Sequence, residues 1–217
     1  KADSGATLAD LKSAALQYEE VARLDPGDAQ TLRTLATLYG QLNDLAGAAK
    51  AWERYLATEP GDLDAYLRLG ALYLAKGETD RAAATFKQAL DVDPGSAPTY
   101  AKLADVFDKA QQLEQAVLHY RKALEIDASD LRTRLALGDV LLRANRPQEA
   151  LAEGEAVLQA DAKNLEGLVL KGSALRDMKE FPAAEAAADQ ALALQRCDLR
   201  AAFLRITILE SREDHQA

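Results

Sequence analysis

The sequence is poor in the residues that most catalytic and metal sites require. It has 217 residues but only 2 histidines and 1 cysteine. One cysteine excludes an internal disulfide, and Cys197, His119 and His215 lack the spacing of metal ligands. A nucleophile would find almost no general base, and His119, in the middle of a helical pattern, is interpreted as a surface histidine. We therefore expect no enzyme activity, no cofactor and no metal ion.

Long apolar runs and an excess of positive charge are also missing. No stretch approaches the roughly 20 apolar residues that span a bilayer. Asp and Glu number 35 against 26 Lys and Arg, a formal net charge of -9, whereas binding to phosphate backbones relies on clustered cations. We expect no nucleic-acid partner and no direct membrane insertion. The Ala-, Leu- and Arg-rich composition favours a soluble bacterial protein of the cytoplasm or the periplasm.

What the sequence does contain is a repeat of 34 residues. Asp25-Pro26-Gly27-Asp28 returns as Glu59-Pro60-Gly61-Asp62 and as Asp93-Pro94-Gly95-Ser96. A fixed period of this length indicates stacked repeats. The frames predict five full repeats, at 29–62, 63–96, 97–130, 131–164 and 165–198, with half repeats at 1–28 and 199–217, the last ending in a polar tail after about residue 213.

Small residues occupy two places of every frame, as close helix packing requires. The eighth place holds Ala36, Gly70, Ala104, Gly138 and Gly172, and the twentieth holds Ala48, Ala82, Ala116, Ala150 and Ala184. Repeat two shows the fullest pattern, with Tyr66, Leu69, Gly70, Tyr73, Ala82, Phe86, Ala89 and Pro94. This pattern resembles the tetratricopeptide repeat, a helix-turn-helix unit. The resemblance implies an all-α, right-handed α-solenoid of stacked antiparallel helix pairs, and we expect residues 1–217 to form one array.

Helix ends recur in the same register. The predicted N-caps of the first helices are Asp28, Asp62, Ser96, Asp130, Asn164 and Asp198. Asn43, Gly77 and Asn145 stand where a left-handed residue ends a helix, and Thr7 with Asp10 resembles a capping box.

Partners of this family usually lie along the concave face, so the resemblance implies a partner-binding groove on the first helices. The groove residues that we expect are Arg33, Thr37, Leu67, Arg68, Leu74, Lys102, Asp105, Leu135, Asp139, Leu142, Val169, Leu170, Ser173 and Arg176. The early part is basic and the later part is apolar, which favours an amphipathic helix or an extended peptide as partner. Substituting Leu135 and Val169 by Asp is expected to abolish partner capture without unfolding the chain.

Two charged patterns in this groove do not indicate catalysis or a known clamp. Asp105 and Asp139 share the ninth place of adjacent repeats, and neighbouring helices would separate them by roughly 10 Å. That is beyond the roughly 5–5.5 Å of a retaining glycosidase and near the upper limit for an inverting one, and Lys102, Lys109 and Arg143 would keep both carboxylates ionised. The Asn residues of the family's carboxylate clamp are absent, with Thr37 and Arg68 among the residues in their places.

Repeats four and five depart from the pattern at the twenty-fourth place. Trp52, Phe86 and Tyr120 there give way to Gly154 and Ala188. We expect tighter packing and a change of curvature to absorb the lost volume. Lys171 and Arg205 replace the usual Leu at the seventh place, which predicts that the neighbouring Leu170 and Leu204 rotate inward.

The function that the resemblance implies is a protein-interaction scaffold, here expected to be a fragment of a longer bacterial repeat protein. One alternative is a noncatalytic segment of a larger enzyme or of an envelope export, pilus or polysaccharide assembly machine. Another is catalysis by the chain itself. Apolar residues of the terminal helices, such as Phe203 and Ile206, also suggest self-association through the half repeats.

Overall fold

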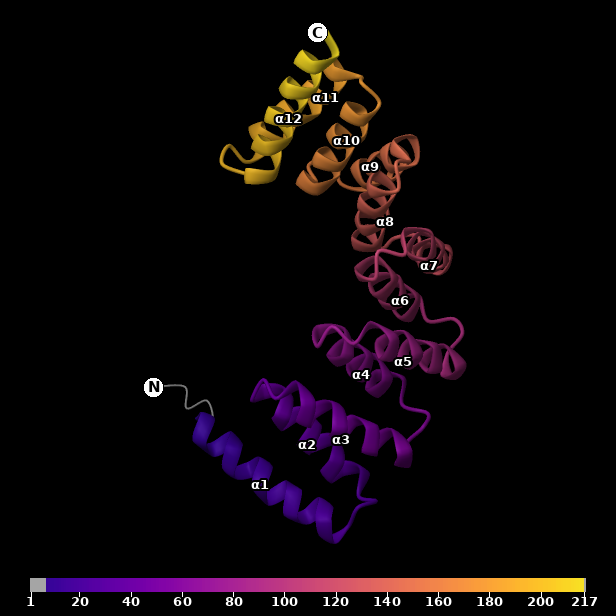
Figure 1. Ribbon diagram of the computed structural model, residues 1–217, viewed down its shortest axis with the longest axis vertical. Coiled ribbons are helices and arrows are strands. Elements are labelled where there is room, and N and C mark those ends of the chain that lie inside the picture. Colours follow the sequence, from indigo (N-terminus) through magenta and orange to yellow (C-terminus); the bar gives the residue numbers. More distant parts are fainter. Residues whose placement is uncertain (1–6, 217) are drawn as a thin grey trace. The chain divides into compact units, whose positions relative to one another are not determined.

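The computed structural model describes residues 7–216, and it describes side chains as far as residue 213 (Figure 1). Within this span the regular structure is entirely α-helical. The helices are α1 (Leu8–Leu24), α2 (Ala29–Gln41), α3 (Leu45–Thr58), α4 (Leu63–Ala75), α5 (Thr79–Val92), α6 (Ala97–Lys109), α7 (Leu113–Ile126), α8 (Leu131–Arg143), α9 (Pro147–Ala160), α10 (Leu165–Asp177), α11 (Phe181–Leu194) and α12 (Leu199–Gln216). The side chain of His215 lies outside the described part. The last helix continues past residue 213, where a polar tail was predicted.

The chain divides into two compact units, residues 1–110 and 111–217. Unit 1 holds α1–α6 and unit 2 holds α7–α12, so the division falls between the two helices of repeat three. Inside each unit every helix packs against the next one along the chain, and α4 also contacts α6, α8 contacts α10, and α10 contacts α12. Stacked helix pairs of this kind confirm the predicted all-α solenoid class. That residues 1–217 form one array stays a prediction.

Side-chain caps begin the first helices at the predicted residues. Asp28, Asp62, Ser96, Asp130 and Asn164 each accept a hydrogen bond from a backbone N–H in the first turn of the helix that follows. Asp198 accepts from the N–H groups of residues 200 and 201 in the same way. The capping box of Thr7 and Asp10 is also present. These bonds satisfy backbone donors that a helix leaves unpaired, so they fix where each repeat starts.

The turn inside each repeat uses one residue in the left-handed region. Asn43, Gly77 and Asn145 have φ values of 57°, 77° and 57°, as predicted. Gln111 and Lys179 adopt the same conformation, with φ values of 58° and 65°. The sequence analysis did not identify these two, because neither residue type favours a positive φ.

In unit 1 an aromatic side chain from a second helix fills the space above a small residue of the first helix. Phe86 of α5 is fully buried against Gly70 of α4, where an added Cβ would lie 2.5 Å from the phenyl Cε1. Trp52 of α3 is also buried and meets Tyr55 edge-on, with ring centroids 5.4 Å apart. The core of unit 1 therefore depends on large residues at the twenty-fourth place.

Unit 2 fills the corresponding space from a different helix. Leu170 of α10 is 3% exposed and packs on Gly138, where an added Cβ would lie 2.3 Å from the leucine Cδ2. Leu204 of α12 packs on Gly172 in the same manner and is 2% exposed. At Gly154 an added Cβ would lie 3.2 Å from the backbone N of Lys171, so α9 and α10 approach closely. The predicted inward rotation is confirmed, and the close approach at Gly154 agrees with the predicted tighter packing. The change of curvature stays a prediction.

The first and last helices each bury one face only. α1 buries Ala15 and Ala22 but leaves Leu8 59% exposed. α12 buries Ile208 while Phe203 stays 66% exposed. α1 packs mainly on α2, and α12 packs on α10 and α11, so the opposite face of each helix carries the exposed apolar side chains.

Candidate functional site

The predicted groove residues of unit 1 lie on the surface formed by α2, α4 and α6, which we call the first-helix surface. Arg33, Thr37 and Arg68 are exposed there. Leu67 and Leu74 are half-buried. Exposed polar groups beside half-buried apolar ones give this surface the character of a binding face rather than of a core.

A hollow of about 460 Å³ opens between α2 and α4 on this surface. Its lining consists of Ala36, Thr37, Gly40, Gln41, Ala48, Trp52, Arg68, Ala71 and Leu72. Small residues make the space, because nothing lies within 4 Å of a Cβ added at Gly40. The lining is apolar where α3 contributes Trp52, and polar where Thr37 and Arg68 stand. We call this space the Trp52 hollow.

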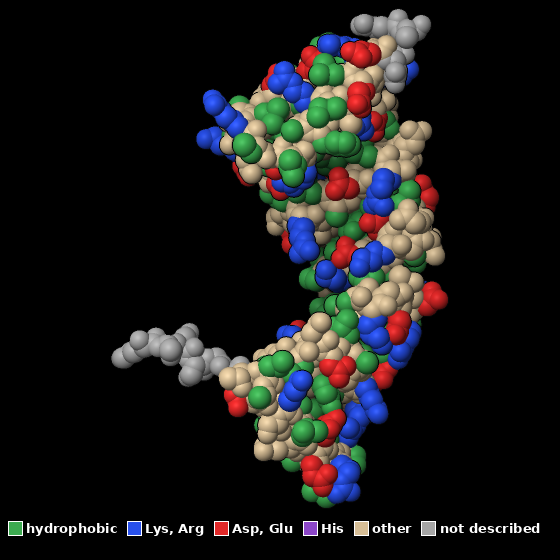
Figure 2. All heavy atoms as spheres, turned by 60° about the vertical axis from the view of Figure 1, so that its left-hand side comes forward, with side chains coloured by type: hydrophobic (Ala, Val, Ile, Leu, Met, Phe, Trp, Pro, Cys, Tyr) green, Lys and Arg blue, Asp and Glu red, His purple; other side chains and the backbone are tan. Residues whose placement is uncertain are grey.

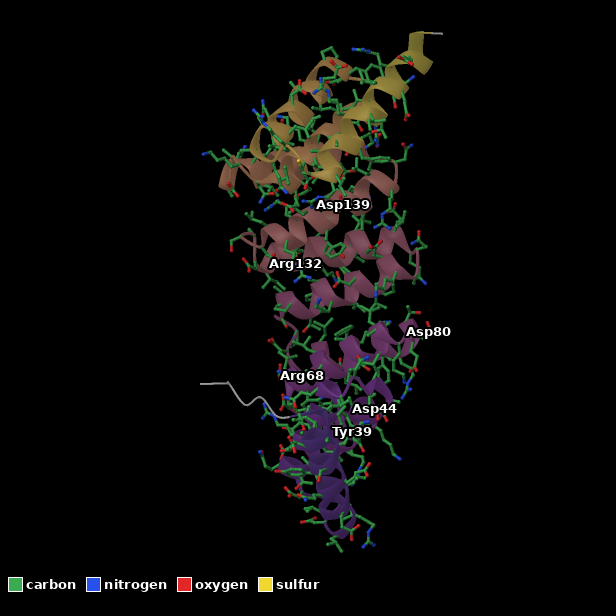
Figure 3. The ribbon with its side chains drawn as sticks, turned by 90° about the vertical axis from the view of Figure 1, so that its left-hand side faces the viewer. Tyr39, Asp44, Arg68, Asp80, Arg132 and Asp139 are labelled. Atoms are coloured by element: carbon green, nitrogen blue, oxygen red, sulfur yellow. The ribbon has the colours of Figure 1, made fainter. Side chains whose placement is uncertain are left out.

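Arg68 stands at the edge of the Trp52 hollow and is only weakly held. Its Nε donates to Asp64 at 2.6 Å, and both side chains are more than half exposed. Its Cζ lies 5.9 Å from the ring centroid of Trp52. An exposed ion pair of this kind contributes about 0–1 kcal/mol, so the guanidinium can take another carboxylate at little cost. Figure 3 labels Arg68 on unit 1.

Two other charged groove residues of unit 1, Lys102 and Asp105, pair with each other. Lys102 Nζ lies 3.0 Å from Asp105 Oδ2, and both residues are half-buried. Asp139, the other member of the predicted pair, belongs to unit 2, so their relation stays a prediction.

In unit 2 the predicted groove residues differ in how much they expose. Asp139 is exposed, and Leu135, Leu142 and Ser173 are half-buried. Leu170 is buried in the core, so its side chain is not available to a partner.

Two further groove residues of unit 2 are already in contact with other parts of the unit. Val169 packs against the core clusters of this unit. Arg176 donates to the Thr207 hydroxyl at 3.0 Å and pairs with Asp177. Because Val169 packs against the core, an aspartate there would cost stability, whereas we expected the fold to stay intact.

A second polar site, which the sequence analysis missed, lies on the second-helix side of unit 1. The Tyr39 hydroxyl donates to Glu19, and the Tyr73 hydroxyl donates to Glu53 in the next repeat. Burial raises the pKa of Tyr39 to about 12, aided by the carboxylates of Glu19 and Asp44. The same 20-residue spacing of Glu and Tyr in two successive frames is the signal that could have found this site.

Other features of the described residues add no catalytic centre. No group of three or more His, Cys, Asp or Glu side chains among them is placed to hold a metal ion. His119, expected on the surface, is half-buried in α7. In the part of the chain that the structure describes, no helix is both long and apolar enough to cross a membrane. On the face shown in Figure 2, acidic and basic side chains are interspersed.

Helix pairs that repeat every 34 residues, with small residues at their contacts and a hollow on the first-helix surface, define a helical repeat protein of the solenoid class. Two tetratricopeptide repeat profiles match the sequence, one over residues 33–97 and the other over residues 73–132. Over residues 33–132 the chain therefore belongs to the tetratricopeptide repeat family. No curated protein matches it in sequence.

Solved structures share this fold at low sequence identity. MamA is 18% identical with a TM-score of 0.72, and the match covers 77% of this chain and 92% of that one. YrrB, described as a TPR protein with an unusual peptide-binding site, is 22% identical with a TM-score of 0.71 and covers 87% and 97%. A tetratricopeptide repeat protein from Parabacteroides merdae is 13% identical with a TM-score of 0.79 and covers 84% and 73%. At these identities the likeness shows the fold alone.

Proposed function

We propose that this protein is a noncatalytic scaffold that binds a partner peptide on the first-helix surface of unit 1. The observation that carries the proposal is the Trp52 hollow, about 460 Å³ in volume and lined by residues of α2, α3 and α4. Ligand pockets commonly have volumes of roughly 300–1,000 Å³. The peptide-binding site named for the structurally similar YrrB agrees with this type of function.

The shape and chemistry of the hollow favour one apolar anchor side chain. Gly40 and Ala71 leave the space open, and Trp52 supplies an apolar wall. A leucine or phenylalanine side chain would displace water from this wall and gain about 25 cal/mol for each Å² of apolar surface that it buries. The partner would thus present a large apolar residue to the space between α2 and α4.

The charges around the hollow favour an acidic residue next to that anchor. Arg68 is exposed at the edge of the hollow, and its bond to Asp64 is easily exchanged. Arg33, also exposed, adds a second positive charge to the same surface. A guanidinium binds a carboxylate through two parallel hydrogen bonds. The proposed partner is therefore a peptide in which an apolar anchor stands beside Asp or Glu.

Other predicted groove residues extend this surface. We include Thr37, Leu67, Leu74, Lys102 and Asp105 of unit 1 in the proposal. For unit 2 the accessible candidates are Leu135, Asp139, Leu142, Ser173 and, in part, Val169 and Arg176, whereas Leu170 is excluded by its burial.

Filling the hollow tests the proposal without disturbing the core. Peptides selected by display on the purified chain should carry an apolar residue next to an acidic one. Gly40→Leu places a side chain in open space, so we expect an unchanged or slightly raised melting temperature and at least tenfold weaker peptide binding. Arg68→Ala should weaken binding chiefly of the acidic peptides.

The matched control is Ala46→Leu, an exposed position of α3 outside the hollow. It should leave binding unchanged. Equal affinity of the Gly40→Leu variant and the original chain, measured by isothermal titration calorimetry, would contradict the proposal.

A further inference from the structure

Two equivalent sites on the second-helix side of unit 1 each have a tyrosine hydroxyl and two carboxylates as acceptors. The site at repeat two has the Tyr73 hydroxyl and the carboxylates of Glu78 and of Glu53, which comes from α3. The residues 34 positions earlier are Tyr39, Asp44 and Glu19, and the Tyr39 hydroxyl again donates to the glutamate. The sites differ in one respect, because Asp44 also accepts from the Gly47 N–H at 2.9 Å, whereas Glu78 makes no cap hydrogen bond.

In repeat two, the chain itself fills this site with a guanidinium. Arg81 donates to Glu78 at 2.9 Å and to the Tyr73 hydroxyl at 2.7 Å, and it also pairs with Glu53. Its Cζ lies 4.1 Å from the Tyr73 ring centroid, so the planar group stacks on the ring. Three acceptors around one stacked plane suit an arginine better than a lysine, whose ammonium has no planar fork.

In repeat one, the residue in the place of Arg81 is Gly47. An added Cβ at this glycine would lie 2.6 Å from Asp44 Oδ2 and 2.9 Å from two ring carbons of Tyr39. Glycine in a helix costs about 1 kcal/mol relative to alanine, yet here no larger residue fits without a shift of Asp44 and Tyr39. Repeat one therefore has the acceptors of the arginine site but no side chain of its own to fill it.

Open space adjoins these acceptors in repeat one. A hollow of about 460 Å³ is lined by Glu19, Tyr39 and Asp44 together with Lys12, Ala15, Leu16 and Leu42. Tyr39 and Asp44 lie close together on unit 1 in Figure 3. We propose that this open site, the Tyr39 notch, binds the side chain of an arginine from a partner protein.

The cations near the Tyr39 notch do not replace that ligand. Arg23 pairs with Glu20, and Arg54 donates to the backbone carbonyl of Ala22 at 2.9 Å. Lys12 also lines the notch, but a single ammonium cannot reproduce the three-way contact that Arg81 makes in repeat two. The notch is separate from the Trp52 hollow, so a partner could use both surfaces.

An NMR titration of the full chain with N-acetylarginine methylamide tests this proposal. We expect saturable shifts of the backbone amides of residues 39, 44 and 47, and none with the neutral citrulline analogue. Glu19→Gln together with Tyr39→Phe should weaken the arginine affinity about tenfold, since it removes a charge-assisted contact. Equal shifts with citrulline, shifts that persist in the double variant, or no saturable shifts would overturn the proposal.

Opening the filled site provides a second test that does not depend on the variants of repeat one. Arg81→Gly should create a new arginine site whose amide shifts appear at residues 53, 73 and 78, and arginine should raise the lowered melting temperature of this variant more than citrulline does. If arginine and citrulline act alike on Arg81→Gly, the inference from repeat two to repeat one is wrong. Gly40→Leu serves as a control, because failure of peptide binding in the Trp52 hollow should leave arginine binding unchanged.

Discussion

The two units solve one packing problem in opposite ways. Each must fill the space above a glycine at the eighth place of a first helix. In unit 1 the second helix of the same repeat supplies Phe86, whereas in unit 2 the first helix of the next repeat supplies Leu170. The glycine is common to both solutions. The comparison shows that this fold requires a filled volume at that point, and that either neighbouring helix can provide it.

A second difference follows from the first. In α10 and α12 the inward leucine stands one residue earlier than in unit 1, so the seventh place turns toward the surface. Lys171 and Arg205 occupy it, and they pair with Glu155 at 3.1 Å and with Asp189 at 2.7 Å. The charged residue at the seventh place and the missing aromatic residue at the twenty-fourth place thus belong to one change, in which a different side of the first helix faces the core.

The largest effect that would test the comparison comes from removing each filling side chain. We expect Phe86→Ala to cost about 3–5 kcal/mol and Leu170→Ala about 2–5 kcal/mol, because both leave a cavity in a buried site. Urea unfolding measures both. Fluorescence of Trp52, the chain's single tryptophan, follows unit 1, and far-UV circular dichroism follows the whole chain. A loss below about 1 kcal/mol in either variant would show that the space collapses without a filler.

A smaller effect would show whether the two solutions can be exchanged. Lys102 stands in repeat three at the place that Leu170 occupies in repeat five. If a leucine there can reach the space above Gly70, then Phe86→Ala with Lys102→Leu should regain about 1–2 kcal/mol of the loss from Phe86→Ala. Lys102→Leu alone, without the cavity, is the control and should gain nothing in the same urea experiment.

The turns of the two units allow a comparison in which the expected changes in unfolding free energy are about 1 kcal/mol. Lys179 of unit 2 has φ 65°, while the corresponding residue of repeat two is Gly77, with φ 77°. Lys179→Gly should stabilise unit 2 by about 0.5–1 kcal/mol, and Gly77→Lys should destabilise unit 1 by about 1–2 kcal/mol. Thermal unfolding would measure both changes, and shifts of the same sign would contradict this account.

The smallest expected effect is a loss of stability at high pH that is specific to unit 1. Burial raises the pKa of Tyr39 from 10.0 to about 12, because the folded state favours the neutral phenol. This contribution is complete below pH 10 and is lost as the pH rises through about 12. The original chain should therefore lose more unfolding free energy between pH 10 and pH 12 than Tyr39→Phe does, as followed by Trp52 fluorescence. In unit 2 the same place holds Leu141 and Leu175, which do not titrate.

The repeat period predicted most of the fold because it depends on local chemistry. Caps such as Asp28 and turn residues such as Asn43 act on their own helix, so their effect can be derived from position alone. The inward rotation of Leu170 was also predictable, since Lys171 occupies the seventh place, where the pattern has a buried leucine. The exposure of each groove residue was less predictable, because it depends on neighbouring helices. Val169, for example, was predicted to lie in the groove and contact a partner, but it packs on the core of unit 2.

The polar site at Tyr39 was missed for a related reason. Its partners come from two repeats, whereas the family pattern predicts contacts within a single repeat. Only the contact of Tyr39 with Glu19, and its counterpart at Tyr73, shows that the pairing recurs. Long-range pairs of this kind require the stacked structure, although the equal spacing in two repeats is visible afterwards in the sequence.

The ion pairs between second helices have a consequence for how near-identical repeats avoid mispairing during folding. In unit 1, Glu53 of α3 pairs with Arg81 of α5, whereas in unit 2, Arg121 of α7 pairs with Glu149 of α9 at the same two places. The charges are reversed. If α3 docked on α9 in place of α5, Glu53 would meet Glu149, and if α7 docked on α5 in place of α9, Arg121 would meet Arg81, so like charges would repel in both cases. The charge reversal therefore disfavours an exchange of partners between these two pairs while leaving the correct order unopposed.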